Sequence, residues 1–463
     1  MLEPTLTPHR EYLLAQIPGQ RLFLALKLRP QAEAAAARPQ LSVAFVVDTS
    51  GSMREVVTEP THRTGRTETV DGKTYEVVKG AKSKMEVVMA SLRGILSSDL
   101  LHEGDRLALV KFDDHAEVLV PFTPAGERSR LLAAVESLSR YSGGTLMGAG
   151  MAEGLTLLEG ESGSKRMMLL TDGQAFDEDV VRDTGDRLAQ ARVPVTAIGV
   201  GEEWNEELLT NLTDRTQGKP FYVVPDTENP QPPAVRMSDL PKEILSDLAH
   251  TAKEVVTNIN LMVRTVKEVT LLRITRVFPV QNEVDKASQP YFLGSAEAGD
   301  ATVFVMEFTL PARPPARMRL AQLGLSYEVP GADYRGEVAP LDVVVEFTQN
   351  ESVAAQLNSE VMGWVQQRNI DGLIRQATVQ AQSDPAQAQK TMELARAMTV
   401  RLGNGVMTQA LDRAINELSS SKTISLGTAK TLKIGAKTQT VKVGDQEGSK
   451  LPSDEEIRRM TGA

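Results

Sequence analysis

Three oxygen-bearing side chains follow a hydrophobic run near the start of the chain and could together hold a metal ion. The run LSVAFVV occupies residues 41–47, and Asp48, Ser50 and Ser52 come directly after it. The alternating spacing, with Gly51 permitting a tight loop, lets one carboxylate and two hydroxyls point at one spot. Oxygen ligands of this kind suit a hard divalent ion such as Mg²⁺, with water completing an octahedral shell. Alone, the segment is weak evidence, because small polar residues are common in turns.

Two later loops supply the same kind of side chain. Thr145 ends the segment Tyr141-Ser-Gly-Gly-Thr145 just before a stretch with helical spacing, and Asp172 follows the apolar run at 166–170. Three loops of this composition, each at a strand-to-helix transition, are much stronger evidence than one. We therefore expect Asp48, Ser50, Ser52, Thr145 and Asp172 to form one metal site.

The elements that must position these loops alternate between strands and helices. Short apolar runs at 41–47, 105–112, 166–170 and 193–200 predict buried strands, and the stretches at 82–96, 128–138, 145–158 and 178–191 have helical spacing. This alternation predicts an α/β fold with a doubly wound, mainly parallel sheet. Ligands of such sheets bind at the edge formed by the carboxyl ends of the strands, which is where all three loops fall.

The motif DxSxS, with the Thr and Asp of the later loops, resembles the metal-ion-dependent adhesion site of the von Willebrand factor A and integrin inserted domains. The resemblance covers residues 41–225 and has all five ligand positions in order. It implies that Asp48 and Asp172 balance the charge of Mg²⁺, or of Mn²⁺ or Ca²⁺, that Ser50 and Ser52 ligate directly, and that Thr145 ligates in one conformation. It also implies that an Asp or Glu of a partner protein takes an open coordination position.

The rest of the chain predicts a β-sandwich and a helical bundle. The division expected is 1–40, N-terminal strands that join the sandwich; 41–225, the von Willebrand A domain; 226–258, a linker and a helix from 238 to about 257; 259–348, the sandwich; 349–420, two or three packed helices; and 421–463, a flexible tail. Proteins of similar build are multidomain bacterial von Willebrand A proteins. By analogy, the helix at 238–256 is a candidate for transmitting changes from the metal site to the sandwich.

The C-terminal tail is rich in Thr and Lys, which predicts disorder or weak strands. A sharper hypothesis is that its threonines are phosphorylated and bound by a phosphothreonine-reading domain, although flexible composition alone gives the same residues. The candidates are Thr423, Thr428, Thr431, Thr438 and Thr440. The segment at 451–460, LPSDEEIRRM, resembles a short capped helix.

About 28 residues, from Arg54 to Ala81, separate the first metal loop from the first helix, where the family usually has none. The Asp71-Gly72 pair between alternating stretches predicts a hairpin that projects from the metal face. Tyr75 of this hairpin and Trp204, in a loop after the last inner strand, are candidate partner contacts. The alternatives are a tolerated surface insertion and a tryptophan that packs against its own loop. Asp113, which also ends a strand at this edge, is expected to hydrogen-bond within the site.

The composition excludes several classes of function. A net charge of -10 argues against nucleic-acid binding, and the absence of cysteine excludes disulfides and thiolate chemistry. The start of the chain lacks a signal peptide, and no run approaches the roughly 20 apolar residues of a membrane span, so a cytoplasmic protein is expected. The sequence has no GxxxxGK[ST] motif and no set of a nucleophile, a histidine and an acid, so we expect a protein that is not an enzyme.

The sequence therefore favours a metal-dependent interaction or scaffold protein. The alternative is a non-catalytic von Willebrand A subunit of an ATPase, chelatase or kinase-linked signalling complex, since such complexes use the same domain.

Overall fold

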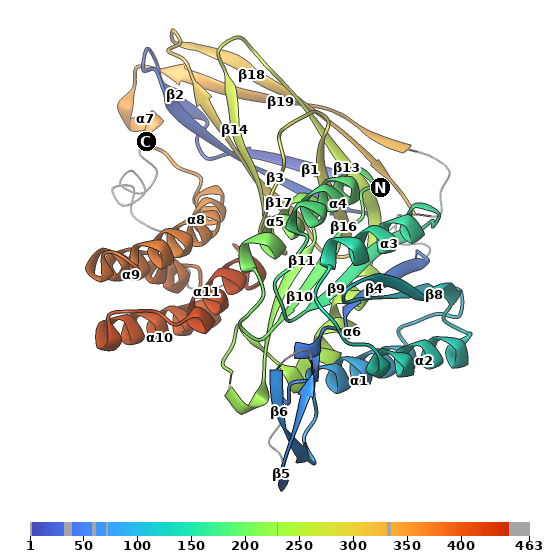
Figure 1. Cartoon of the computed structure of the whole chain (residues 1–463). Coiled ribbons are helices and arrows are strands. Elements are labelled where there is room, and N and C mark those ends of the chain that lie inside the picture. The colour runs from blue at the N-terminus through green and yellow to red at the C-terminus, as the bar shows by residue number, and fades with distance from the viewer. Residues whose placement is uncertain are drawn as a thin grey trace. The chain divides into compact units, whose positions relative to one another are not determined.

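The computed structural model describes residues 2–31, 39–57, 62–70, 73–228, 230–330 and 335–443, and it divides into two compact units (Figure 1). One unit comprises Arg38–Glu254, and the other comprises Met1–Ala37 and Val255–Ala463. The first is a doubly wound α/β unit. The second holds a β-sandwich and a helical region, so the α/β unit is inserted in the chain of the sandwich, as the sequence predicted.

The α/β unit is built on one twisted sheet with the strand order β12-β11-β10-β9-β4-β7-β8. All neighbours are parallel except β8, which pairs antiparallel with β7. The strands are β4 (Leu41–Asp48), β7 (Arg106–Phe112), β8 (Ala116–Pro124), β9 (Ser164–Thr171), β10 (Val195–Val200), β11 (Lys219–Val224) and β12 (Val235–Arg236). Every residue of β4 is buried, because this central strand has helices over both faces and is apolar throughout.

The helices of this unit lie in two layers (Figure 1). The first layer is α1 (Lys84–Leu96), α2 (Arg128–Ser137) and α6 (Leu240–Thr251), and the second is α3 (Met147–Glu159), α4 (Glu178–Gln190) and α5 (Glu206–Thr216). Val43, Phe45 and Val47 of β4 belong to one hydrophobic core with the first layer. Val46 points the other way, and α3 approaches it so closely that a Cβ on Gly154 would lie 2.9 Å from its side chain.

The connection between the two units differs from the prediction. The segment expected to be a linker contains η4 (Asp226–Glu228), the edge strand β12 and the one-turn η5 (Met237–Asp239), so part of it belongs to the sheet. The predicted helix ends at Thr251 rather than near 257. From Glu254 the chain is extended, because the β-branched run Val255-Val-Thr257 favours a strand.

The sandwich consists of two five-stranded sheets in the described part of the chain, with the orders β1-β3-β17-β14-β15 and β16-β13-β18-β19-β2. The N-terminal strands are β1 (Leu2–Pro8), β2 (Tyr12–Leu14) and β3 (Gln20–Pro30). The others are β13 (Glu254–Thr265), β14 (Thr270–Phe278), β15 (Asn282–Glu283), β16 (Tyr291–Glu297), β17 (Thr302–Leu310), β18 (Ala316–Glu328) and β19 (Arg335–Thr348). Strand β3 pairs with β17, so the N-terminal segment completes the sandwich as predicted.

The helical region follows the sandwich and packs on it. Its helices are α7 (Glu351–Ala354), α8 (Ser359–Gln380), α9 (Pro385–Arg401), α10 (Gly405–Ser421) and α11 (Leu426–Thr438). Trp364 and Val365 of α8 share a hydrophobic core with Phe23 and Val305, on the face of β3 and β17 that points away from the other sheet. Asp384 caps α9 by accepting a hydrogen bond from the backbone N–H of Gln387 at 3.0 Å. None of the described helices is both long and apolar enough to cross a bilayer.

The predicted flexible tail is wrong for residues 421–443. Ser425 caps α11, and the helix buries Leu432, Ile434 and Ala436 against the helical region. The composition concealed this helix, because its polar residues outnumber the apolar ones that reach the core. The segment at 451–460 lies outside the described residues.

Candidate metal centre

Strand β4 delivers the first part of the site. Asp48 is its last residue and is fully buried. The backbone N–H of Ser50 donates to Asp48 Oδ1 at 2.8 Å, and the hydroxyl of Thr171 donates to Asp48 Oδ2 at 2.7 Å. The chain then turns through the short helix η2 (Gly51–Arg54), which brings the hydroxyl oxygens of Ser50 and Ser52 within 3.2 Å of each other.

Strand β9 delivers the second carboxylate. It lies beside β4 in parallel, so Asp172, the residue after its end, reaches the same edge of the sheet. The Ser52 hydroxyl donates to Asp172 Oδ1 at 2.8 Å. Four of the five predicted ligands are therefore linked by hydrogen bonds through side chains or, for Asp48 and Ser50, through a backbone N–H.

Thr145 lies in the loop before α3, and two backbone contacts hold this loop against the other two. The N–H of Gly51 donates to the carbonyl of Gly143 at 3.1 Å, and the N–H of Phe176 donates to the carbonyl of Thr145 at 3.0 Å. The Thr145 hydroxyl would lie 3.4 Å from a Cβ placed on Gly173, so it is beside the residue that follows Asp172. Within the described part of the chain, the Thr145 side chain makes no direct hydrogen bond to the other four ligands.

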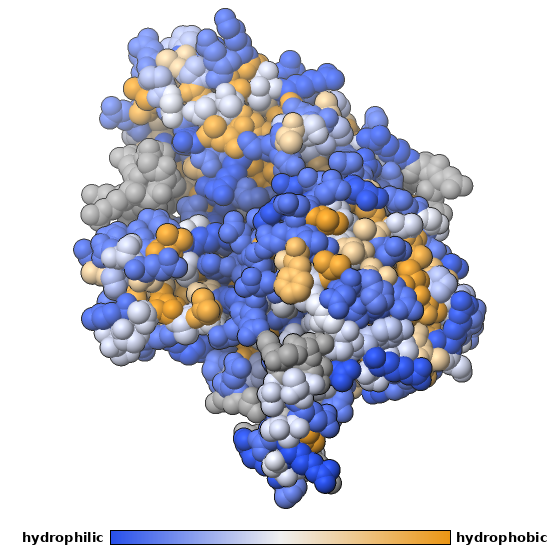
Figure 2. All heavy atoms as spheres, viewed as in Figure 1, coloured by the Kyte–Doolittle hydropathy of each residue, from blue (hydrophilic) through white to orange (hydrophobic). Residues whose placement is uncertain are grey.

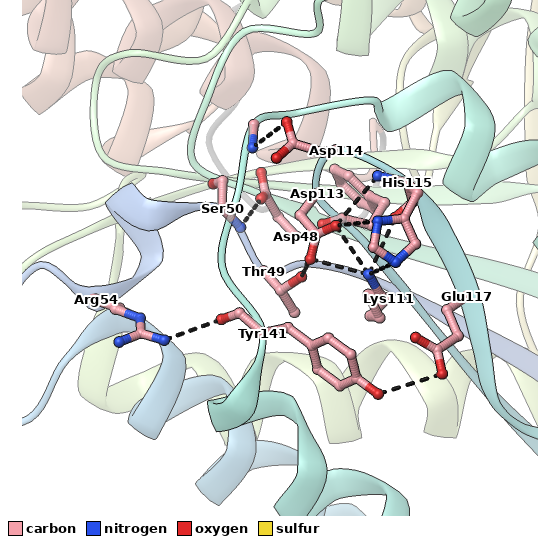
Figure 3. A network of polar contacts seen from close by, with 12 residues as sticks. Asp48, Thr49, Ser50, Arg54, Lys111, Asp113, Asp114, His115, Glu117 and Tyr141 are labelled. Carbon is pink, nitrogen blue, oxygen red and sulfur yellow. Dashed lines mark hydrogen bonds and ion pairs between the residues drawn. The ribbon is translucent and has the colours of Figure 1, made fainter. Parts of the chain in front are cut away.

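The glycines before Thr145 lie close to the carboxylate of Asp114. A Cβ on Gly143 would lie 2.6 Å from Asp114 Oδ2, and a Cβ on Gly144 would lie 2.7 Å from Asp114 Oδ1. The carboxylate of Asp114 accepts a hydrogen bond from the N–H of Gly144 at 2.9 Å (Figure 3). A larger residue at either position would push the loop that carries Thr145 away from this anchor.

The electrostatics of the site favour a bound cation. Burial first, and the neighbouring charge of Asp172 second, raise the pKa of Asp48 to about 7, although hydrogen bonds from Ser50 and Thr171 act in the opposite direction. Within the described ranges, no three His, Cys, Asp or Glu side chains form a metal-binding cluster, so the site offers two carboxylates and three hydroxyls. This set of hard oxygen donors fits a small divalent ion that keeps some of its water.

A second polar network lies beside the loop that follows Asp48 (Figure 3). The Thr49 hydroxyl donates to Asp113 Oδ2 at 3.0 Å, and the ammonium of Lys111 donates to both oxygens of Asp113 at 2.9 and 3.0 Å. Lys111 and Asp113 are buried. Asp113 was expected to hydrogen-bond within the site; in the described part of the chain it bonds to Thr49, Lys111 and His115 rather than to any of the five predicted ligands, and the Thr49 contact fixes the backbone between Asp48 and Ser50.

Comparison with known proteins identifies the unit that carries this site. The family model for the von Willebrand factor type A domain matches residues 42–233. These residues form a von Willebrand factor type A domain.

Relatives extend the likeness beyond that domain. An uncharacterized protein of Synechocystis sp., sll0103, is 23% identical over 372 residues, which cover 75% of this chain and 76% of the relative. The solved structure of a von Willebrand factor type A protein from Catenulispora acidiphila has a TM-score of 0.72 at 17% identity and covers 95% of this chain and 97% of that one. The ArnB paralog VWA2 from Sulfolobus acidocaldarius has a TM-score of 0.59 at 13% identity, with 95% and 99% coverage. At these identities, the structures share the fold.

Trp204 is not an exposed partner contact of the von Willebrand A domain, so that prediction is wrong. Its side chain is buried, and its Nε1 donates to the carbonyl of Gly201 at 2.7 Å. The indole covers Gly199, where a Cβ would lie 2.2 Å from the ring, and it lies 5.8 Å from the ring of Tyr222. The alternative interpretation, a tryptophan that packs against its own loop, describes this residue.

The insertion of the von Willebrand A domain forms a hairpin, as predicted. Strands β5 (His62–Val70) and β6 (Lys73–Lys79) pair antiparallel and are joined by residues 71–72, which lie outside the described residues. Tyr75 lies in β6, opposite Glu68. Its backbone position is all that is described, so its role as a partner contact stays a prediction.

The five candidate phosphorylation sites lie outside the von Willebrand A domain, in and around α11. Only Thr423 is exposed, whereas the other four are half-buried. The Thr428 hydroxyl donates to Glu417 at 2.6 Å, the Thr438 hydroxyl donates to the Ile434 carbonyl, and the Thr440 hydroxyl donates to the Pro279 carbonyl. Phosphorylation of these threonines stays a prediction, and at the half-buried positions it would require local opening of the helix.

The sequence reasoning missed two residues at the metal edge of the von Willebrand A domain. Lys84, the first residue of α1, is buried and its Nζ donates to Asp172 Oδ2 and to Glu55 Oε2, each at 2.7 Å. Burial lowers the pKa of Lys84, but these two carboxylates outweigh it, and the pKa is raised overall.

Phe176, four residues after Asp172, is the other missed residue. It is 74% exposed, which makes it the most exposed large hydrophobic side chain of the described residues. Its ring lies against Gly144, where a Cβ would be 2.9 Å from Cε2. On the face drawn in Figure 2, apolar side chains occur in separate groups among hydrophilic ones rather than as one continuous patch. The signal available in the sequence was an aromatic residue in the loop that follows Asp172.

Proposed function

We propose that this protein is a metal-dependent interaction protein, in which Asp48, Ser50, Ser52, Thr145 and Asp172 hold a divalent ion and the ion binds a carboxylate of a partner protein. The observation that carries the proposal is the chain of contacts from Ser50 to Ser52 to Asp172 beside the buried Asp48. These side chains converge at the carboxyl edge of the sheet, and among the described residues Lys84 is the one cation that pairs with them.

The chemistry of the donor set supports a binding role. The charges of two carboxylates match a divalent ion, and hydroxyls are weak, neutral ligands that leave the ion electrophilic. Mg²⁺ fits this set, and Mn²⁺ or Ca²⁺ would take the same ligands. Such an ion attracts a further anionic oxygen, which an Asp or Glu of a partner supplies. A buried contact between charges of this kind gives specificity as well as affinity.

An exposed aromatic side chain beside the site supports a protein partner in particular. Phe176 donates its backbone N–H to the Thr145 carbonyl, so its backbone is anchored next to the metal loop. Exposed aromatic residues near the centre of an interface often carry much of the binding energy. We propose that the partner covers Phe176 while its carboxylate reaches the ion.

The proposal predicts no chemical transformation. In this proposal the hydroxyls of Ser50 and Ser52 act as ligands, and the ion holds an anionic ligand rather than activating water. The protein would then act as a receptor or scaffold, alone or within a larger assembly.

The test is capture of partners from a lysate of the source organism by the full chain, in Mg²⁺ and in EDTA. We expect a set of proteins that binds in Mg²⁺ only and that Asp48→Ala no longer captures. Asp186→Ala is the matched control, because it removes an exposed carboxylate of α4 that pairs with Arg215. Equal capture by Asp48→Ala and the wild type would sink the metal-mediated function. An ATPase or a kinase among the captured proteins would favour a subunit role.

A further inference from the structure

Lys84 is held rigidly at the metal edge by the base of the hairpin insertion. The chain on either side of the insertion pairs closely, since Val57 N–H donates to the Lys82 carbonyl and Lys84 N–H donates to the Glu55 carbonyl, each at 2.9 Å. Ser83 caps α1 in a reciprocal arrangement with Glu86. The backbone of Lys84 is thus fixed both by a strand-like pairing and by the start of a helix.

The side chain of Lys84 occupies one oxygen of a metal-site carboxylate. Its ammonium lies 2.7 Å from Asp172 Oδ2, while the Ser52 hydroxyl takes Asp172 Oδ1. Both oxygens of Asp172 therefore have hydrogen-bond donors. Asp48 differs, because its contacts come from a backbone N–H and a neutral hydroxyl, with no ammonium.

This difference separates the roles of the two carboxylates. A carboxylate that binds an ion directly must turn an oxygen lone pair toward it, and an ammonium on that carboxylate competes for its charge. Asp48 is free of such competition. Asp172 can act through the Ser52 hydroxyl or through water without giving up Lys84.

We infer that Lys84 is a positioning residue that keeps Asp172 from binding the ion directly, so that the ion stays weakly held and keeps a coordination position for the partner. This inference rests on the proposed function. Direct ligation by a second carboxylate would quench the charge of the ion and strengthen its binding. The ion would then attract the carboxylate of a partner less strongly.

A purely structural role for Lys84 makes a different prediction. If the ion pair only stabilises the fold, removing the cation should lower the stability of the protein without raising its affinity for the metal. The two roles therefore differ in whether removing the Lys84 charge strengthens metal binding.

The experiment titrates the full chain with Mn²⁺ and measures free Mn²⁺ by electron paramagnetic resonance and bound water by proton relaxation. We expect Lys84→Met to bind Mn²⁺ about tenfold more tightly than the wild type and to hold fewer exchangeable waters on the ion. Lys84→Arg should behave like the wild type, because it keeps the charge. Lys82→Met, which removes a lysine from an exposed position two residues earlier, should change the affinity far less, since solvent screens its charge.

The outcomes separate the inference from the proposed function. Weaker or unchanged Mn²⁺ binding by Lys84→Met, with normal binding by the wild type, would overturn the inference alone. No Mn²⁺ binding by either folded protein would overturn the metal site and with it the proposed function. If Lys84→Met does not fold, Lys84→Gln replaces it, since Gln retains a hydrogen bond to Asp172 but not the charge.

Discussion

Two clusters of charged side chains, one in each unit, show how differently this chain uses ionised groups. In the sandwich unit, Glu307 accepts from Arg21 at 2.8 Å and from Arg368 at 2.9 Å, and the Arg368 guanidinium lies 5.3 Å from the Phe23 ring centre. At the edge of the von Willebrand A domain, the buried cation Lys84 pairs with Asp172 and Glu55, whereas Asp48 accepts only from a backbone N–H and a hydroxyl.

The comparison teaches that the balance of charge, rather than burial, distinguishes a structural group from a binding site. Each oxygen of Glu307 pairs with a guanidinium, so its negative charge is neutralised without a further cation. The carboxylates at the metal edge exceed their cations, and the negative charge of Asp172 adds to the effect of burial in raising the pKa of Asp48. A divalent ion would correct the imbalance.

Removing the charge of Glu307 should have the largest effect on stability. Glu307→Met leaves Arg368 buried without its anion, and we expect the sandwich unit to lose about 3–5 kcal/mol in free energy of unfolding. The matched control is Asp342→Asn, which breaks the more exposed pair with Arg319 and should cost about 0–1 kcal/mol. Denaturant unfolding of the full chain measures both, and similar losses for the two variants would contradict the importance of burial.

Adding Mg²⁺ should stabilise the von Willebrand A domain alone. At 100 times the dissociation constant, a ligand that binds only the folded state contributes about 2.7 kcal/mol. We expect calorimetry to show one transition that moves upward with Mg²⁺ and another that does not, and Glu307→Met identifies the second. A parallel shift of both transitions would mean that the ion acts elsewhere.

Without metal, the von Willebrand A domain should become less stable as the pH rises. The pKa of Asp48 is about 7 in the folded state against 3.8 for an ordinary Asp, so its favourable contribution is complete below about pH 4 and is lost as the pH passes 7. In EDTA at pH 8, Asp48→Asn should therefore raise the Tm by a few degrees, since about 1 kcal/mol shifts a unit of this size by about 2–4 °C. Asp186→Asn is the control, and a fall in Tm for Asp48→Asn would refute the argument.

The sandwich should respond to pH in the opposite direction. Burial, with Arg10 nearby, lowers the pKa of His9 from 6.5 to about 3, and its neutral Nδ1 accepts from the N–H of Phe23 at 3.2 Å. The contribution of His9 is present above pH 6.5 and is lost as the pH falls toward 3. We expect urea unfolding in saturating Mg²⁺ to show a shallower loss between pH 6.5 and 4 for His9→Gln than for the wild type. Identical slopes would show that His9 does not carry the effect.

Phe176 should affect binding and leave stability nearly unchanged. Because its side chain is mostly in solvent, Phe176→Ser should alter the free energy of unfolding by no more than about 0.5 kcal/mol, yet reduce Mg²⁺-dependent capture of partners. Val379→Ser, at a position 68% exposed on α8, is the control and should leave capture intact. Full capture by Phe176→Ser would place the partner elsewhere on the edge.

The parts of the fold that were predictable are those that depend on local pattern. The apolar runs of β4 and β9 and the polar residues after them predicted both the sheet and the convergence of Asp48 with Asp172, because parallel neighbours end at one edge. Residues whose environment comes from distant segments were not predictable. Trp204 is buried by its packing on Gly199 and Tyr222, and α11 is ordered because Leu432 and Ala436 reach a core made mostly by α8, α9 and α10.

The contact of Lys84 with the metal site could not be predicted from the sequence either. The sequence Lys82-Ser-Lys84 contains two lysines, and only the rotation at the start of α1 decides which one meets Asp172. That rotation is set by the pairing of Glu55 and Val57 with Lys82 and Lys84, on either side of an insertion whose ends cannot be aligned from the sequence alone.

Because the two ends of that insertion lie side by side, the hairpin between them can be replaced by another segment. Paired strands lie about 5 Å apart, so Val57 and Lys82 are close enough for a short turn or an independently folded domain to replace everything between them. Closing a longer loop across fixed ends adds little entropy cost, about 0.6 kcal/mol for each doubling of its length. The chain thus offers an entry point beside its metal edge through which new recognition surfaces can be exchanged without rebuilding the ligands.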